Sequence, residues 1–346
     1  MKKLTFILLS LLMLIAGGAT ADACSRVVYI GDKGPVLVGR TLDWRTPIPT
    51  NIYVYPRGMA KTSMPTAPSL SWTSKYGSVL AVGYDGGVTE GMNDQGLVMN
   101  GLFCKGTIYR TATGSDNTPV MSLAVLVSYF LDNFASVDEV KTWLAANDFA
   151  IFGQTFDGGT VSALHWAITD KTGNTLLMEY VDGKLTTYEG SDIRVLTNDP
   201  PYPQMTAIND YWKKVGGVNM LPGTVRSQDR FVRASFFINH VPSNVDYDAA
   251  LGSVMSIMGN VAVPYGYEIE TEPNVSSTQW TSIADATNGR YYFHLATCPG
   301  YFWIDLGQLI LHPGAPVLKF DTAKNAQAMG DVTGRLEKSA PFTPMW

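Results

Sequence analysis

The strongest constraint on the fold is a pair of strand-like runs near the start of the chain. Residues 25–31 and 35–43 are rich in β-branched and apolar residues, and only a three-residue connection ending in Gly34 separates them. Two such runs around a short glycine-containing turn predict an antiparallel β-hairpin. With the turn centred near residue 33, the numbers of paired residues sum to about 66, so Cys24 is predicted to face roughly Leu42.

The segment before this hairpin has the layout of a cleaved secretory signal. Two lysines follow Met1, residues 4–15 form an apolar run, and a small-residue stretch ends in Ala-Asp-Ala at positions 21–23. This A-x-A pattern predicts cleavage after Ala23, and the run is too short for a comfortable membrane span. We expect residues 1–23 to be removed and residues 24–346 to form a single exported domain. The alternative is an uncleaved N-terminal anchor.

The rest of the chain alternates between strand-like and helix-like segments. Strands are predicted over residues 51–55, 78–84, 97–103, 161–169, 175–181, 276–282, 290–295 and 302–306, and helices over 119–134, 136–144, 205–214, 229–239 and 247–258. Hydrophobic residues make up 46% of the chain and charged residues 16%, which is enough to bury a substantial core. The order of segments predicts a layered α+β domain with mostly antiparallel sheets. The tail from Lys319 remains unassigned.

Composition and motifs exclude several functional classes. The net charge is −5 and no Lys/Arg-rich run occurs, so neither nucleic acid nor an anionic membrane surface is an expected partner. The four histidines lack metal-ligand spacing, and neither a phosphate-binding loop nor a dinucleotide fingerprint is present, so we expect no metal and no cofactor. Of the three cysteines, Cys104 and Cys298 could pair in an oxidising compartment, which would leave Cys24 as the odd one.

A thiol at a free N-terminus carries its own base. An α-amino group titrates at about 7.7–8.0, so part of it is neutral near pH 7 and can take the proton of the Cys24 thiol. Across the predicted hairpin, Arg40 can favour the thiolate and Asp43 can accept a hydrogen bond from the amine. Residues three apart on a regular strand point to opposite faces, so both reach Cys24 only if a bulge or the strand end turns Asp43.

Two other interpretations of these residues compete. Arg40 and Asp43 together also fit a surface ion pair near a chain terminus. Cys24 also fits a lipidated cysteine after a signal peptide, but a lipobox needs Leu and small uncharged residues before the cysteine, and Asp22 argues against it.

Five short segments then occur in a recognisable order. They are Cys24-Ser-Arg followed by Gly39 to Trp44, Gly91 to Leu97, Leu196 to Pro200, Leu221 to Gly223, and Ser227 to Arg233. Together they resemble the choloylglycine hydrolase family, which includes bile salt hydrolases and penicillin V acylases among the N-terminal nucleophile hydrolases.

This resemblance implies a fold and a set of roles. It implies a four-layer αββα sandwich in which two antiparallel sheets are flanked by helices. Cys24 would attack an amide carbonyl and form a thioester that water hydrolyses, with Arg40 and Asp43 beside it. Asn198 would help to stabilise the oxyanion through its side-chain amide. Arg230 would hold the surroundings of the nucleophile and keep the local field positive.

The chain also departs from the family pattern. Many members carry a second Asn where this chain has Phe103, which offers no side-chain donor to an oxyanion, so we expect a backbone N–H to complete the hole or the site to suit other substrates, with Phe103 contacting the substrate. The stretch between Asn198 and Arg230 is shorter than in Gram-positive bile salt hydrolases. It is similar to the exported Gram-negative branch, which implies a periplasmic location and a homotetramer or homodimer.

The resemblance predicts hydrolysis of a linear amide that joins an apolar acyl group to an amine or amino acid. Glycine- or taurine-conjugated bile acids are the first expectation, and penicillin V and N-acyl homoserine lactones come next. Two alternatives of another class stay open. One is a lipid-anchored ligand-binding protein acylated at Cys24, and the other is a catalytically inactive protein that binds amphiphiles, for which Phe103 is the hint.

Overall fold

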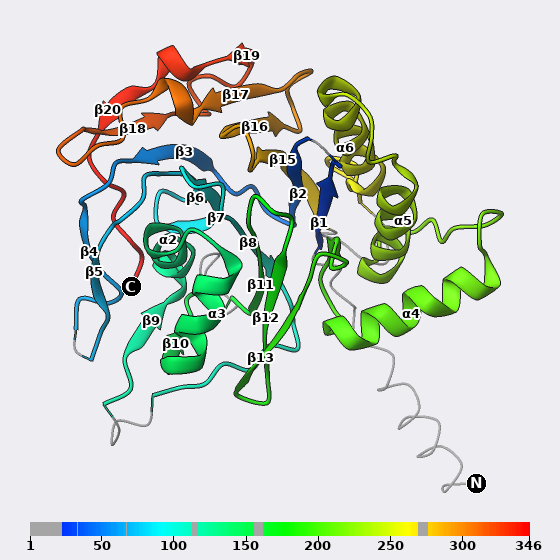
Figure 1. Cartoon of the computed structure of the whole chain (residues 1–346), viewed down its shortest axis with the longest axis horizontal. Coiled ribbons are helices and arrows are strands. Elements are labelled where there is room, and N and C mark those ends of the chain that lie inside the picture. The colour runs from blue at the N-terminus through cyan, green and yellow to red at the C-terminus, as the bar shows by residue number, and fades with distance from the viewer. Residues whose placement is uncertain (1–22, 33, 67, 113–116, 156–161, 269–275) are drawn as a thin grey trace, which may run out of the picture.

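The predicted hairpin forms the centre of the molecule. The computed structural model describes residues 23–32, 34–66, 68–112, 117–155, 162–268 and 276–346 (Figure 1). Strand β1 (Ala23–Ile30) pairs antiparallel with β2 (Val36–Trp44), and Cys24 lies opposite Leu42. The predicted register is therefore confirmed, while Lys33 at the tip of the turn and residues 1–22 of the predicted signal segment lie outside the described residues.

Two large sheets carry the strands. The seven-stranded sheet has the order β14-β1-β2-β15-β16-β17-β19 and the nine-stranded sheet the order β13-β12-β11-β8-β7-β6-β3-β18-β20. The further strands of the first sheet are β14 (Val195–Leu196), β15 (Ser277–Asp285), β16 (Arg290–Leu295), β17 (Phe302–Asp305) and β19 (Gly330–Asp331). Those of the second are β3 (Thr50–Tyr55), β6 (Ser78–Gly83), β7 (Gly87–Asn93), β8 (Val98–Phe103), β11 (Leu164–Thr169), β12 (Thr175–Val181), β13 (Lys184–Gly190), β18 (Val317–Phe320) and β20 (Glu337–Ser339). The prediction of two antiparallel sheets needs one correction, because the edge pair β17–β19 is parallel.

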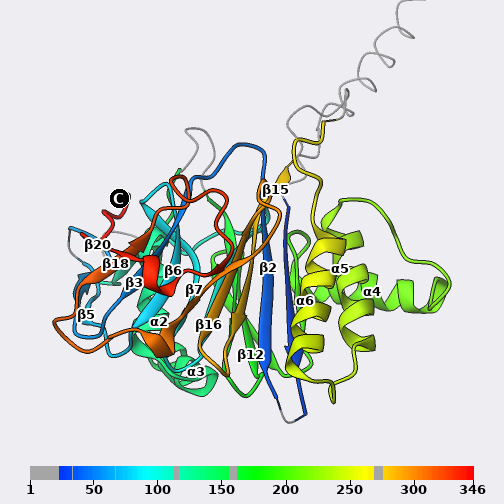
Figure 2. The same cartoon turned by 90° about the horizontal axis from the view of Figure 1, so that it is seen from above.

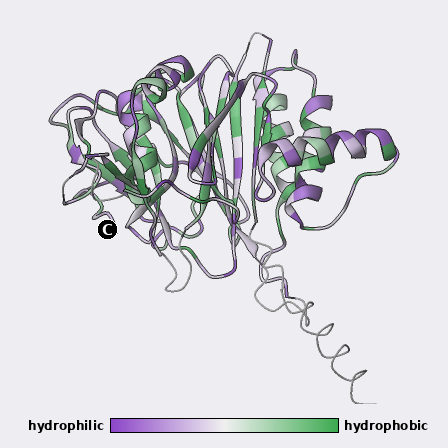
Figure 3. Cartoon of the chain, turned by 90° about the horizontal axis from the view of Figure 1, so that it is seen from below, coloured by the Kyte–Doolittle hydropathy of each residue, from purple (hydrophilic) through white to green (hydrophobic). Residues whose placement is uncertain are grey.

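Helices cover both outer faces. Helices α2 (Leu123–Asn133) and α3 (Val137–Ala146) lie on the nine-stranded sheet, and α5 (Ser227–His240) and α6 (Tyr247–Val261) lie on the seven-stranded sheet, with α4 (Tyr202–Val215) beside α5 (Figure 2). Separate apolar cores fill the space under each helix layer and the space between the sheets. Figure 3 shows the hydrophobic colour gathered on the strands and on the sheet-facing sides of these helices. The predicted αββα sandwich is confirmed.

Local sequence signals explain how the helices begin and how closely they pack. The Ser136 hydroxyl accepts from the Glu139 N–H, and the Glu139 carboxylate accepts from the Ala135 N–H, so these two side chains cap the start of α3 in a variant of the capping box. On the other face, α6 comes so close to β2 that a Cβ added to Gly39 would lie 2.8 Å from Met258 Sδ. A glycine at position 39 therefore sets the spacing between this helix layer and its sheet.

Several predictions need correction. The predicted helix over 119–134 begins later, because residues 120–122 form the short strand β9 (Val120–Ser122) beside β10 (Ala150–Phe152). Strand β7 was not predicted, since its glycine-rich sequence lacks apolar alternation. The tail left unassigned from Lys319 contributes the end of β18 and all of β20 to the nine-stranded sheet, and β19 to the seven-stranded sheet.

Short strands β4 (Ala60–Thr62) and β5 (Ser71–Thr73) and the single turns η1 (Leu306–Gln308) and η2 (Thr333–Arg335) complete the fold. All three cysteines are free thiols, so the pairing of Cys104 with Cys298 does not form. Within the described ranges, no helix is both long enough and apolar enough to cross a membrane.

Candidate active site

The Cys24 thiol lies between the two sheets. Because side chains alternate along a strand, Cys24 and Arg40 share the inner face of the β1–β2 hairpin. Cys24 is 4% exposed and its Sγ lies 3.8 Å from Nη2 of Arg40, which also donates to the Gly101 carbonyl at 3.0 Å. The predicted approach of a cation to the thiol is present.

Asp43 points to the opposite face of the same hairpin. Its carboxylate accepts hydrogen bonds from the hydroxyls of Thr278 at 2.6 Å and Thr41 at 3.2 Å, and it lies 3.9 Å from Nη1 of Arg230. A register shift between β2 and β15 occurs beside Asp43, but the irregular residue is on β15. Among the contacts of the described residues, none joins Asp43 to the nitrogen of Cys24. The expected bond is therefore absent while Cys24 remains in a peptide linkage to Ala23.

Burial dominates the ionisation of Asp43. The side chain is fully buried, and this raises its pKa to about 6, against the opposing influence of Arg230 and Thr278. Asp43 is therefore ionised at neutral pH but becomes protonated in mildly acidic solution.

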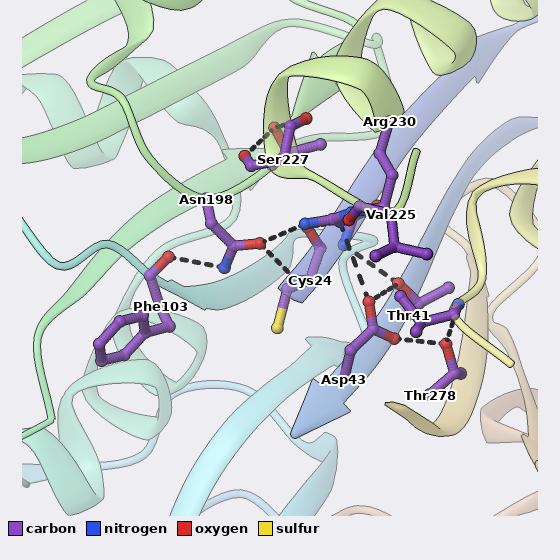
Figure 4. Close-up of polar contacts among 12 residues, drawn as sticks. Cys24, Thr41, Asp43, Phe103, Asn198, Val225, Ser227, Arg230 and Thr278 are labelled. Carbon is purple, nitrogen blue, oxygen red and sulfur yellow. Dashed lines mark hydrogen bonds and ion pairs between the residues drawn. The ribbon is translucent and has the colours of Figure 1, made fainter. Parts of the chain in front are cut away.

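Asn198 meets the nitrogen of Cys24 from a distant segment (Figure 4). Its Oδ1 accepts from the Cys24 N–H at 2.5 Å and from Nη2 of Arg230 at 2.8 Å. Its Nδ2 donates to the Phe103 carbonyl at 2.7 Å. An amide group has two N–H donors, so this bond leaves one donor for another acceptor.

Arg230 ties the same residues together from α5. Its Nη1 donates to the Cys24 carbonyl at 2.6 Å and to the Ser25 hydroxyl at 2.5 Å, and its Nε donates to the Val225 carbonyl at 2.9 Å. Arg230 is fully buried, and burial lowers its pKa while Asp43 raises it. The site thus joins the helix layer to the backbone around the thiol.

An apolar pocket of about 100 Å³ opens beside the thiol. Its apolar wall includes Leu42, Trp44, Ile48, Val88, Phe103, Leu123 and Leu164. The rings of Trp44 and Phe103 meet edge to face, 5.4 Å between centroids. Phe103 thus lines this pocket, while its contact with a substrate stays a prediction, and its carbonyl also accepts from Asn198.

Two buried groups around the site were missed by sequence reasoning. Glu90 on β7 lies 3.2 Å from Nη1 of Arg40, and both side chains are buried. His165, one of the four histidines without metal-ligand spacing, is fully buried and contacts the segment that carries Asn198, through the Thr197 carbonyl at 2.7 Å. The position of Glu90 directly before the Gly91-Met-Asn motif was the one available signal.

The surroundings of His165 favour the protonated form of its ring. Its Nδ1 lies 2.9 Å from the Glu179 carboxylate, so both ring nitrogens face acceptors. Burial alone would lower its pKa, but hydrogen bonds to Cys104 and Glu179 raise the pKa to about 10. Within the described part of the chain, no group of three or more His, Cys, Asp or Glu side chains is arranged to hold a metal ion.

Comparison with known proteins agrees with this geometry. The family of linear amide C–N hydrolases, choloylglycine hydrolase family, matches residues 24–324. The chain belongs to the choloylglycine hydrolase family. It is therefore a hydrolase of linear amide carbon–nitrogen bonds.

Relatives of two kinds are found within this family. A penicillin V acylase of Pectobacterium atrosepticum is 34% identical over 98% of this chain and 96% of its own length. A bile salt hydrolase/transferase of Clostridium perfringens is 29% identical over 78% of this chain and 88% of its own length.

Solved structures show the same pattern. A penicillin V acylase from Agrobacterium tumefaciens is 39% identical with a TM-score of 0.86, and the match covers 93% of this chain and 99% of that structure. A mutant conjugated bile acid hydrolase from Clostridium perfringens is 23% identical with a TM-score of 0.71, covering 86% and 96%, and this likeness shows the shared fold.

Proposed function

We propose that this amidohydrolase acts as a penicillin V acylase-type enzyme, cleaving amides of a compact apolar acyl group with Cys24 as nucleophile. The penicillin V acylase relative matches 98% of this chain, whereas the bile salt relative matches 78% at lower identity. This reverses the order expected from sequence alone, which put conjugated bile acids first.

The pocket carries the choice of substrate class. Its volume of about 100 Å³ lies below the range of about 300–1,000 Å³ typical of ligand sites, and a cavity of about 150 Å³ holds a benzene ring. A pocket of this size, walled by Trp44 and Phe103, favours a short chain or part of one aromatic ring over a fused steroid. N-acyl homoserine lactones with short acyl chains remain a second candidate for the same reason.

The reaction follows from the contacts around Cys24. After cleavage behind Ala23, the free α-amine takes the thiol proton, and Arg40 at 3.8 Å favours the thiolate. The sulfur adds to the amide carbonyl, and the free N–H of Asn198 stabilises the oxyanion. The α-ammonium then protonates the departing amine, which leaves a thioester. Water, deprotonated by the same amine, hydrolyses the thioester and releases the acid.

Asp43 and Arg230 support these reaction steps without contacting the carbonyl group of the substrate. Arg230 holds the Cys24 carbonyl and Asn198 Oδ1, while Asp43 offsets the charge of Arg230 from 3.9 Å. We place the mature protein in the periplasm of a Gram-negative cell, as a homodimer or homotetramer. Its expected partner is a small amphiphilic amide.

Turnover measurements test the substrate class. The purified mature protein should hydrolyse penicillin V with a kcat/KM at least tenfold above those for glycine- and taurine-conjugated cholate. Cys24→Ser should abolish turnover, and it serves as the control for contaminating acylases. Faster turnover of conjugated bile acids would refute the substrate assignment while leaving the nucleophile intact.

Mass spectrometry of the mature N-terminus tests the remaining alternatives. We expect an unmodified Cys24 as the first residue. A diacylglyceryl group on Cys24 would instead support the lipid-anchored alternative. In a separate binding assay, saturable binding of penicillin V without its hydrolysis would support the inactive binding protein.

A further inference from the structure

We propose that Glu90 is a positioning residue for Arg40. It fixes the orientation of the guanidinium so that Nη2 faces Cys24, and its negative charge limits the positive field at the thiol. Glu90 lies on β7, at the point where the inner faces of the two sheets meet. Its Oε2 is 3.2 Å from Nη1 of Arg40, and the two side chains are 1% and 2% exposed.

Glu90 is held by donors from three other strands. The Tyr291 hydroxyl donates to Oε1 at 2.6 Å, Ser282 donates to the same oxygen, and Nδ2 of Asn100 donates to Oε2 at 3.0 Å. Burial and Glu90 both raise the pKa of Tyr291 well above its ordinary value, so the phenol keeps its proton and remains a donor. A carboxylate buried in this way is costly unless it is fully bonded, and here it is.

Arg40 is fixed on three sides. Nη1 forms an ion pair with Glu90 without a hydrogen-bond geometry, Nη2 donates to the Gly101 carbonyl, and the guanidinium lies over the Trp280 ring at 4.6 Å from its centroid. A guanidinium is planar and rigid. When Glu90 holds Nη1 and Trp280 covers one face, Nη2 is the nitrogen left to face the Cys24 sulfur. Without Glu90, nothing among the described contacts would hold Nη1.

The charges around Cys24 show what Glu90 does electrostatically. Buried titratable groups lie on both sides of the hairpin that carries Cys24. Arg26 on β1, Arg40 on β2, His165 on β11, Glu179 on β12 and Tyr291 on β16 are on its inner side, and Asp43 on β2 and Arg230 on α5 are on its helix side. Arg26 donates from Nε to Asn100 Oδ1 at 2.7 Å, so it shares the Glu90 network. Glu179 pairs with His165, so Arg26 and Arg40 share the single carboxylate of Glu90, and a Cys24 thiolate would supply a second negative charge beside them.

The test is the pH dependence of Cys24 alkylation, which does not require the correct substrate. The proposal rests on Cys24 as the nucleophile, and failure of penicillin V as the substrate would leave this readout unchanged. Iodoacetamide labelling is followed by peptide mass mapping, so that Cys104 and Cys298 are counted separately.

Removing the charge should shift the profile in one direction. In Glu90→Gln, the midpoint of the pH–rate profile should move down by about one pH unit, because the field of Arg40 is no longer offset. The kcat for penicillin V should fall about tenfold, because the guanidinium edge is less well held, while KM changes less than threefold.

Two further variants separate charge from fit. Glu90→Asp keeps the charge but shortens the reach, so its midpoint should return to that of the wild type while kcat stays low. Ser282→Ala removes one donor without changing any charge, and its midpoint should not move. An unshifted or raised midpoint in Glu90→Gln, or equal midpoints in the Gln and Asp variants, would overturn the proposal. If Glu90→Gln does not fold, a shifted midpoint in folded Glu90→Asp overturns it, and an unshifted midpoint with lowered kcat supports it.

Discussion

Replacing Asn198 tests the central contact of the site. Asn198→Ala removes three buried hydrogen bonds, those to the Cys24 nitrogen, to Arg230 and to the Phe103 carbonyl. Each unpaired buried partner costs about 1–3 kcal/mol, so the loss of three bonds should lower the free energy of unfolding by about 3–9 kcal/mol. Loss of one oxyanion donor lowers kcat by about 100- to 1,000-fold in comparable sites. We expect both effects, measured by urea unfolding and by penicillin V turnover well below the melting temperature.

A matched control separates stability from catalysis. Asn93 is also buried, and it makes four hydrogen bonds, to the Leu131 and Phe134 carbonyls and from the Gln95 and Leu97 N–H groups. Asn93→Ala should therefore lose a similar unfolding free energy while its kcat stays within about threefold of wild type.

A second variant of Asn198 tests the donor itself. Asn198→Asp keeps an oxygen for Arg230 and the Cys24 nitrogen but removes the N–H donors, so its kcat should fall as far as that of Asn198→Ala. A kcat for either Asn198 variant within fivefold of wild type, or an equal loss of kcat in Asn93→Ala, would refute the assignment.

The remaining predictions concern the free energy of unfolding. The buried side chains of Asp43 and His165 should each make it fall as pH rises, in different pH ranges, and Gly39 tests the spacing between α6 and β2. Asp43 has a folded pKa of about 6 against 3.8 in the unfolded chain, so its contribution is fully present below 3.8 and is lost as pH rises through about 6. With the Ala23–Cys24 peptide bond intact, the stability of Asp43→Asn relative to wild type should thus rise by about 2 kcal/mol from pH 4.5 to pH 8, and parallel unfolding curves would contradict this. The His165 pKa of about 10 lies above the ordinary 6.5, so wild-type stability should decline as pH rises through about 10. His165→Phe should not show this decline, and by leaving the Glu179 charge unpaired it should cost about 3–5 kcal/mol in urea unfolding at pH 7. Gly39→Val would place its Cβ 2.8 Å from Met258 Sδ and should lower the unfolding free energy by about 1–3 kcal/mol with kcat unchanged, whereas a neutral effect on thermal unfolding would show that α6 can move away.

The hairpin was predictable because a short turn fixes its register. The sum rule placed Cys24 opposite Leu42, and the structure has that pair. Side chains alternate along a strand, so the sequence also indicated that Arg40 and Asp43 point to opposite faces, and the structure confirms this. The bulge that would have turned Asp43 is not on β2 but on the neighbouring strand β15. The sequence could not show this, because the paired segments lie more than 230 residues apart and leave no local signal.

The charged groups between the sheets were not predictable for a related reason. Glu90 is on a strand whose residues GVTEGMN show no period of two, so neither the strand nor its buried face could be assigned. Its partners Tyr291 and Ser282 come from the other sheet. A buried carboxylate becomes recognisable only when the strands that supply its donors are known to be adjacent.

The long-range contacts of Cys24 also have a kinetic consequence. Its nitrogen bonds to a residue 174 positions away and its carbonyl to one 206 positions away. Contacts of such large sequence separation are slow to form, because loop closure is entropically costly before any packing repays it. The environment that activates the thiol therefore assembles only when the two sheets and the helix layer have come together. A chain that is still unfolded carries an ordinary cysteine, and in a refolding experiment the enzymatic activity should appear with the last folding phase rather than with the initial collapse.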